Sequence, residues 1–200
     1  MSQAFLASRN RKKLDELRRI LGAEVPDLEV VGLDDVPAYD EPAETEPSFE
    51  GNALIKARAG LAATGLPSLA DDSGLCVDAL SGMPGVLSAR WAGSAKNDAA
   101  NNRLLLDQLA DVPDDRRGAE FRCAVALCRP DGGEHVVFGE MRGRIIREQR
   151  GTGGFGYDVV FVPEGETRTS AEMAADEKDA ISHRGKSLRA VAPLVAAIVG

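Results

Sequence analysis

The chain has 200 residues but few of the side chains that build metal or disulfide sites, with three cysteines and two histidines. The cysteines, Cys76, Cys123 and Cys128, form no C-x-x-C pair. A structural zinc site of cysteine and histidine ligands is therefore not expected. We interpret the cysteines as reduced structural thiols.

Long apolar runs are also missing, since none approaches the ~18 residues that cross a bilayer. The opening segment, residues 1–8, reaches polar and basic residues too early for a signal peptide. The hydrophobic fraction of 44% is ordinary for a soluble globular protein. These features predict a cytoplasmic protein with no membrane partner.

The chain also lacks an excess of positive charge. The net charge of −8 argues against a general nucleic-acid binder. A small anionic ligand is still possible because the charges are clustered. Residues 9–19 carry six basic side chains, and residues 40–50 carry five acidic ones. A positive pocket beside a metal-binding acidic rim is compatible with this arrangement.

The length predicts one domain over residues 1–200, with two lobes around a cleft. The sequence pattern predicts strands over 5–7, 28–31, 67–70, 75–80, 121–128, 135–141 and 159–162. Helices are predicted over 14–21, 53–63 and 97–109, and from 171 onward with a break near 183–185. Gly22 is expected to end the first helix, and Asp131-Gly132 predicts a hairpin. This alternation predicts an α/β fold with a mixed sheet.

The densest chemistry lies in Ser68 to Gly74, where Asp71 and Asp72 follow a short apolar run. We predict that this pair lies where a strand opens into a loop, one side chain facing the loop and the other the opposite side. Paired carboxylates suit Mg²⁺, which binds one or two of them and completes its shell with water and substrate phosphate. The alternative is a polar turn between two strands.

A second candidate site is the first strand–loop–helix, which carries Ser8, Asn10 and Lys13. A helix N-terminus offers free N–H groups and a positive dipole end, so this turn could hold a phosphate. The alternative is an ordinary N-cap followed by a solvated basic face.

A third candidate is the pair Asn52 and Lys56, which are four residues apart and share one helical face. Lys56 could reach a phosphate from the inner edge of this helix. A surface lysine is the alternative.

The segment Gly151 to Asp158 matches G-x-G-x-x-G by letter. A predicted strand follows it instead of a helix, so a dinucleotide-binding turn is excluded. Its glycines, beside Phe155 and Tyr157, predict a flexible loop that presents aromatic faces to a base. The alternative is a glycine-rich turn with two core aromatics. Gly185-Lys186-Ser187 is no P-loop, because Ala180 stands where that motif needs glycine.

Taken in order, six segments resemble the non-standard purine nucleoside triphosphate pyrophosphatase family, the inosine triphosphate pyrophosphatases or XTP/dITP diphosphatases. The matching segments are 8–13, 48–53, 69–75, 84–90, 153–158 and 182–185. The resemblance implies an elongated mixed β-sheet flanked by helices, two lobes with a central active-site cleft, and a homodimer. It implies Mg²⁺-dependent hydrolysis of ITP, dITP and XTP to the monophosphate and pyrophosphate, which removes deaminated purines from the nucleotide pool.

The resemblance also implies roles for residues. Asp72 would be the general base and a metal-linked acid, with Glu44 and Asp71 beside the metal. The triphosphate would contact Ser8, Arg9, Asn10, Arg11, Lys12, Lys13, Lys56 and Ser73. The base pocket would comprise Phe155, Gly156, Tyr157, Asp158, Lys178, His183 and Arg184. Two positions depart from the family pattern, with Ser8 for the common threonine and Trp91 for the common tyrosine.

The chemistry of these residue types agrees with hydrolysis by water, because no cysteine or serine nucleophile lies beside a base. Asp72 would accept the proton of the attacking water. Arg184 can only donate, so it should favour the keto oxygen of hypoxanthine or xanthine over the amino group of adenine. Two alternatives remain at this point: a pyrophosphatase of similar fold for pyrimidine or modified standard nucleotides, and a nucleotide sensor that does not hydrolyse.

Overall fold

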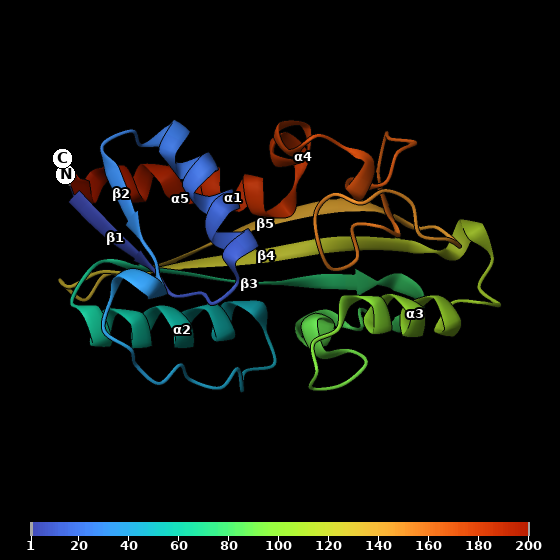
Figure 1. Cartoon of the computed structure of the whole chain (residues 1–200), viewed down its shortest axis with the longest axis horizontal. Helices are drawn as coiled ribbons and strands as arrows, with labels where there is room; N and C mark the ends of the chain where they lie inside the picture. Colours follow the sequence, from blue (N-terminus) through green and yellow to red (C-terminus); the bar gives the residue numbers. More distant parts are fainter. Residues whose placement is uncertain (1, 200) are drawn as a thin grey trace. The chain divides into compact units, whose positions relative to one another are not determined.

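A computed structural model describes residues 2–199 as an α/β fold built on a six-stranded mixed sheet (Figure 1). The strand order is β2-β1-β3-β4-β5-β6. The strands are β1 (Ser2–Leu6), β2 (Leu28–Val31), β3 (Ser68–Val77), β4 (Gly118–Cys128), β5 (Glu134–Ile145) and β6 (Phe161–Pro163). β1 pairs in parallel with β2 and β3, and β5 pairs antiparallel with β6. This mixed sheet, flanked by helices, confirms the predicted fold class.

Five α-helices accompany the described strands. They are α1 (Arg11–Glu24), α2 (Phe49–Thr64), α3 (Asp98–Gln108), α4 (Ala175–Ile181) and α5 (His183–Val199). Short 3₁₀ turns occupy Leu33–Asp35, Asp78–Leu80, Gly85–Arg90, Asp114–Arg116 and Ser170–Glu172. Among the described residues, none of the helices is both long and apolar enough to span a membrane.

The chain divides into two compact units. Unit 1 comprises Met1–Asp72, Cys123–Gly139 and Arg184–Gly200, and unit 2 comprises Ser73–Arg122 and Glu140–His183. β3, β4 and β5 each contribute residues to both units. The three cysteines are free and buried, as predicted for structural thiols.

Unit 1 has an apolar core on each face of its part of the sheet. On one face, α1 and α5 pack through Leu17 and Leu188 against Leu69 of β3. On the other, α2 packs through Ala53 and Ala57 against Ala70 of the same strand. Successive strand residues point to opposite faces, so Leu69 and Ala70 of β3 belong to different cores.

Unit 2 has one core, in which Leu105 of α3 and its C-cap residue Leu109 pack with the second half of β3 and the start of β4. Tyr157 and Phe161 complete it. The residues of this core are fully or nearly buried, with Leu105, Leu109 and Phe161 at 0% exposure. The loop before β6 is therefore anchored by its own aromatic residue.

Most predicted elements are present, but four predictions were wrong. The helix predicted from 171 onward begins only at Ala175, after a 3₁₀ turn at Ser170–Glu172. The segments 67–70 and 75–80 are not two strands, because β3 runs without interruption from Ser68 to Val77. The acidic pair thus lies inside a strand, neither at its end nor in a turn. Gly22 does not end α1, which continues to Glu24 and is capped by Val25. The last strand begins at Phe161 and not at Val159, since residues 157–160 form turns.

Candidate active site

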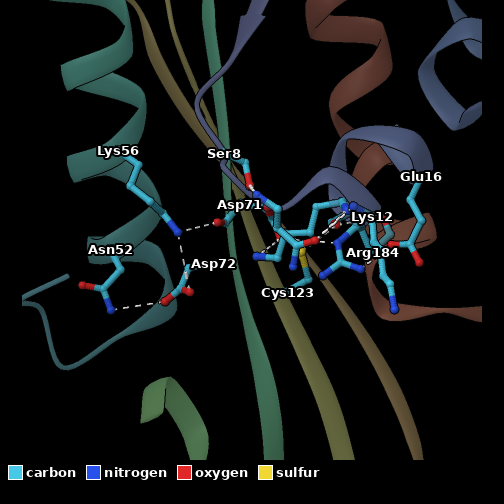
Figure 2. Close-up of polar contacts among 12 residues, drawn as sticks. Ser8, Lys12, Glu16, Asn52, Lys56, Asp71, Asp72, Cys123 and Arg184 are labelled. Atoms are coloured by element: carbon cyan, nitrogen blue, oxygen red, sulfur yellow. Dashed lines mark hydrogen bonds and ion pairs between the residues drawn. The ribbon is translucent and has the colours of Figure 1, made fainter. Parts of the chain in front are cut away.

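Asp71 and Asp72 lie in the buried middle of β3, at 3% and 6% exposure. Because neighbouring strand residues face opposite sides, Asp71 follows Leu69 toward α1 and α5, and Asp72 follows Ala70 toward α2. Figure 2 shows the two carboxylates with separate sets of partners. The prediction that the two acids face opposite sides is confirmed.

Asp72 is held by two side chains of α2. Asn52 Nδ2 donates to Asp72 Oδ2 at 3.2 Å, and Lys56 Nζ lies 3.7 Å from Asp72 Oδ1. The expectation that Asn52 and Lys56 share one helical face is confirmed, and Lys56 is not a surface lysine, with 15% of its side chain exposed. Burial raises the pKa of Asp72 to about 6, with the charges of Glu44 and Asp71 adding to the rise and Lys56 and Lys13 opposing it.

Glu44 reaches the same place from the acidic loop before α2. Its Oε1 pairs with Lys56 Nζ at 2.8 Å. Asn52 also holds this loop, since its Oδ1 accepts from the Glu46 amide at 2.9 Å and its Nδ2 donates to the Glu46 carbonyl at 3.1 Å. One amide side chain therefore positions both Asp72 and the segment that carries Glu44.

Lys56 contacts both neighbouring aspartates of β3 as well as Glu44. Its ammonium donates to the Asp71 carbonyl at 2.7 Å in addition to its contacts with Glu44 and Asp72. Burial would lower the pKa of Lys56, but the charges of Asp72, Asp71 and Glu44 outweigh burial and raise it. The lysine is thus a fixed positive charge at the centre of the acids.

On the opposite face, the Asp71 carboxylate binds two cations. Lys13 Nζ lies 2.8 Å from Asp71 Oδ2, and Arg184 Nε lies 3.3 Å from the same oxygen. Burial alone would raise the pKa of Asp71, but the charges of Lys13, Arg184 and Lys56 outweigh it and hold the pKa well below its usual range. The ionised form of this carboxylate is therefore strongly favoured.

The turn before α1 is ordered by its own side chains. Asn10 is the N-cap of α1, because its Oδ1 accepts from the amides of Lys12 and Lys13 at 3.1 and 3.3 Å. Ser8 Oγ accepts from the Asn10 amide at 3.3 Å. The capped amides are already bonded, so the Lys13 ammonium and the Ser8 hydroxyl are the groups that this turn best offers to an anion.

The arginines of this turn pair with acidic residues other than Asp71 and Asp72. Arg9 pairs with Glu41 at 2.8 Å. Arg11 is exposed and pairs with Asp34 at 3.4 Å. Lys12 is exposed at the start of α1, and Ser73 is half-buried directly after Asp72 in β3. Lys13, Lys56 and the two acids form the compact part of the predicted phosphate site.

The predicted base-binding residues of unit 2 form a group around a glycine-rich loop. Asp158 Oδ2 accepts from the Phe155 amide at 2.9 Å and from Lys178 Nζ at 2.6 Å. Lys178 Nζ also lies 5.4 Å from the centroid of the Phe155 ring. Gly154 has a φ of +67°, and a Cβ there would lie 2.1 Å from Asp158 Oδ2. Only glycine fits this close turn.

Tyr157 is not presented by the loop, which corrects the expectation of two exposed aromatic faces. Its ring is 3% exposed, and its hydroxyl donates to the Ser88 carbonyl at 2.8 Å. Phe155 is half-buried. The Tyr157 ring is instead part of the apolar core of unit 2.

His183 and Arg184 are neighbours in sequence but have different surroundings. The His183 ring stacks on Phe121, with centroids 4.8 Å apart, and is 5% exposed in unit 2. Arg184 belongs to unit 1, where it meets Asp71. The interruption between the helices α4 and α5 lies at Ser182, close to the break predicted near residues 183–185.

Three residues of these sites were missed as site residues from sequence. Glu16 pairs with Arg184, and it lies three residues after Lys13 on α1, a spacing that places both on one helical face. Asp98 and Asn102 of α3 hold Gly156, since Asp98 Oδ2 accepts from its amide and Asn102 Nδ2 donates to its carbonyl, both at 2.8 Å. No local sequence signal connects α3 to this loop.

The comparisons with known proteins agree with this fold. The chain matches the model of the Ham1 family over residues 4–194 and belongs to that family. It is 61% identical to a dITP/XTP pyrophosphatase of Nocardia farcinica, covering 99% of this chain and 97% of the relative. A dITP/XTP pyrophosphatase of Streptomyces coelicolor is 53% identical over the full length of both chains.

Solved structures give the same result. A dITP/XTP pyrophosphatase from Mycobacterium abscessus has a TM-score of 0.77 at 57% identity, covering 96% of this chain and 99% of that one. A HAM1 protein from Coxiella burnetii has a TM-score of 0.87 at 38% identity, covering 98% and 100%. The family resemblance noted in the sequence is confirmed.

Proposed function

We propose that this protein is a Mg²⁺-dependent pyrophosphatase that hydrolyses ITP, dITP and XTP to the nucleoside monophosphate and pyrophosphate. The names of its full-length relatives support the reaction. The observation that carries the proposal is the setting of Asp72, a buried carboxylate held by Asn52 and Lys56 beside Glu44. Removal of deaminated purines from the nucleotide pool would be the consequence.

The residues around Asp72 fit a divalent cation. Asp72 and Glu44 place two carboxylates around the ammonium of Lys56. Within residues 2–199, no three acidic, histidine or cysteine side chains gather to hold a metal by themselves. Mg²⁺ commonly takes one or two carboxylates and completes its shell with water and phosphate oxygens, so Asp72 and Glu44 would hold it. When bound, it would neutralise phosphate charge and orient the attacking water.

The chain's own residues would carry out the proton transfer. Asp72 would accept the proton of the attacking water, as a carboxylate placed beside the phosphates can do. Asn52 fixes the carboxylate through Oδ2, which leaves Oδ1 on the side of Lys56. Lys56 and Lys13 would stabilise negative charge on the triphosphate and on the leaving pyrophosphate.

The base would be selected by Phe155, Lys178 and Arg184. Phe155 is half-buried, and its ring would stack on the base. Arg184 would donate to the keto oxygen at C6, and adenine would place an amino donor against the same guanidinium. Such a mismatch leaves polar groups unpaired and discriminates against the wrong base.

A release assay with product identification tests this proposal. Purified protein with Mg²⁺ should release pyrophosphate and monophosphate from ITP, dITP and XTP far faster than from ATP, CTP or UTP, with no early free phosphate. Diphosphate plus phosphate would place attack at the γ position. Preference for a pyrimidine triphosphate would favour the related pyrophosphatase, and binding without turnover would favour a sensor.

We also propose that the protein acts as a homodimer in the cytoplasm. The family resemblance is the support for this assembly. Size-exclusion chromatography with light scattering would test it, and a monomer mass at assay concentration would contradict it.

A further inference from the structure

The Arg184 guanidinium lies between two carboxylates that come from different elements of unit 1. Its Nε donates to Asp71 of β3 at 3.3 Å, and its Nη1 pairs with Glu16 Oε2 of α1. Figure 2 shows the three side chains side by side. Arg184 is 4% exposed, and the Glu16 side chain is 13% exposed. The guanidinium is therefore bound at two points of its planar fork.

These contacts link Arg184 to the lysine of the phosphate site. Asp71 Oδ2 accepts from both Lys13 and Arg184, so one oxygen connects the two cations. Glu16 pairs with the same guanidinium, so Lys13, Asp71, Arg184 and Glu16 form one connected charge network.

A buried charge network is a weak source of stability, because desolvation offsets much of the attraction. It is, however, an effective means of fixing a side chain, since arginine otherwise loses considerable rotamer freedom when it binds a ligand. Burial would lower the pKa of Arg184, and the charges of Asp71 and Glu16 outweigh it and raise the pKa. The network thus favours a fixed, charged guanidinium.

We propose that Glu16 is a positioning residue that, together with Asp71, holds Arg184 in the orientation in which it meets the nucleotide. The inference rests on the proposed function, because it requires Arg184 to contact substrate. Asp71 would then act as a common anchor of Lys13 and Arg184 and not as a metal ligand. Glu16 itself would touch no substrate.

The test compares Glu16→Gln, which keeps the shape and removes the charge, with Asp15→Asn, which removes the same charge from an exposed neighbour on α1. We expect Glu16→Gln to lower kcat/KM for ITP roughly ten-fold or more, the size of one lost charge-assisted hydrogen bond. The ITP-to-ATP ratio should shift in the direction that Arg184→Ala shifts it. Asp15→Asn should leave both values unchanged.

A double-mutant cycle separates positioning from a general structural effect. In an Arg184→Ala background, Glu16→Gln should change kcat/KM for ITP less than about two-fold, because its effect passes through the arginine. If Glu16 is only structural, Glu16→Gln will reduce ITP and ATP use equally and add its full effect to that of Arg184→Ala. That result would overturn the inference.

Glu16→Asp provides a second variant that keeps the charge but shortens its reach, so it should retain more of the ITP-to-ATP ratio than Glu16→Gln. Melting temperatures of all variants are measured alongside the kinetics. Wild-type protein that fails to cleave ITP would overturn the proposed function and this inference with it. Normal wild-type cleavage with an unchanged ratio in Glu16→Gln would overturn this inference alone.

Discussion

Asp71 and Asp72 are adjacent in β3, yet their carboxylates lie on opposite faces of the sheet with different electrostatic surroundings. Asp71 is bound by Lys13 and Arg184, and its pKa is lowered. Asp72 faces Asn52 and Lys56, and its pKa is raised to about 6. Two carboxylates with pKa values displaced in opposite directions are expected to have different roles.

Asp72→Asn should abolish most activity and preserve the fold. Loss of a general base costs ~10²–10⁴-fold in rate, and weakened metal binding would add to the loss. Because burial raises the pKa of Asp72, ionisation of this acid disfavours the folded state above about pH 6. The melting temperature of Asp72→Asn at pH 7.5 in a chelator should therefore equal or exceed that of the wild type. Near-normal turnover by the folded variant would contradict the assignment.

Removal of divalent cations should abolish pyrophosphate release, and Mg²⁺ should restore it. The variant Glu44→Gln should need more Mg²⁺ for half-maximal activity, because it removes one of the two acids around Lys56. Asp71→Asn should leave that Mg²⁺ concentration near the wild-type value, since its carboxylate binds Lys13 and Arg184 instead. A Mg²⁺ titration of each variant measures this. If both variants needed equally more Mg²⁺ for half-maximal activity, Asp71 would also be a metal ligand.

Lys56→Ala should reduce triphosphate use without changing base preference. Its ammonium contacts Glu44 and Asp72. In the proposed complex it would also contact the phosphates, which every nucleotide shares. We expect kcat/KM for ITP and for a poor substrate such as GTP to fall by similar factors. Arg58→Ala is the matched control on the same helix, since Arg58 is more exposed and pairs with Glu134. A large change in the ITP-to-GTP ratio would place Lys56 at the base.

Arg184→Ala should narrow the ITP-to-ATP ratio. It removes a donor that suits the keto oxygen of hypoxanthine and opposes the amino group of adenine, so ITP use should fall sharply and ATP use should change little. Lys186→Ala, an exposed residue of the same helix, should have no effect. An Arg184→Ala variant with an unchanged ITP rate and ratio would limit this arginine to a structural role.

The thiols should react only after unfolding. Burial raises the pKa of Cys123 to about 12, with the charge of Asp71 adding to it, and burial raises the pKa of Cys128 to about 11. Since the thiolate is the reactive form, both should be inert at pH 8. A thiol-specific reagent should find three accessible thiols in guanidinium and almost none in the native protein. Rapid labelling of one native thiol, located by mass spectrometry, would contradict this.

The sequence predicts much of the fold because local signals are strong in several places. Asn10 caps α1, and the turn at Asp131-Gly132 separates β4 from β5. The C-terminal helical region is interrupted just before His183. The continuity of β3 was missed because Asp71, Asp72, Ser73 and Gly74 have low strand propensity. Pairing with neighbouring strands and two apolar cores overrides that propensity.

The candidate site was predicted as a set of residue types but not as a set of contacts. Arg184 and Glu16 are 168 residues apart, and no local pattern connects them. Gly22 was expected to end α1 from its residue type alone. A glycine commonly ends a helix where its backbone adopts a positive φ, and Gly22 does not. Its surroundings are open, and α1 continues for two more residues. Tyr157 was misplaced because its burial depends on the core of unit 2.

The alternation of partners along β3 makes the length of that strand as important as its composition. Deleting or inserting one residue between Ser68 and Asp71 would exchange the faces of the two acids, because a one-residue slip reverses every side chain of a strand. Asp72 would then point toward α1 and α5, and Asp71 toward Asn52 and Lys56. Relatives that change length should therefore do so in the loop before α2 or between β4 and β5. A functional chain with a single-residue insertion in β3 would need a compensating bulge.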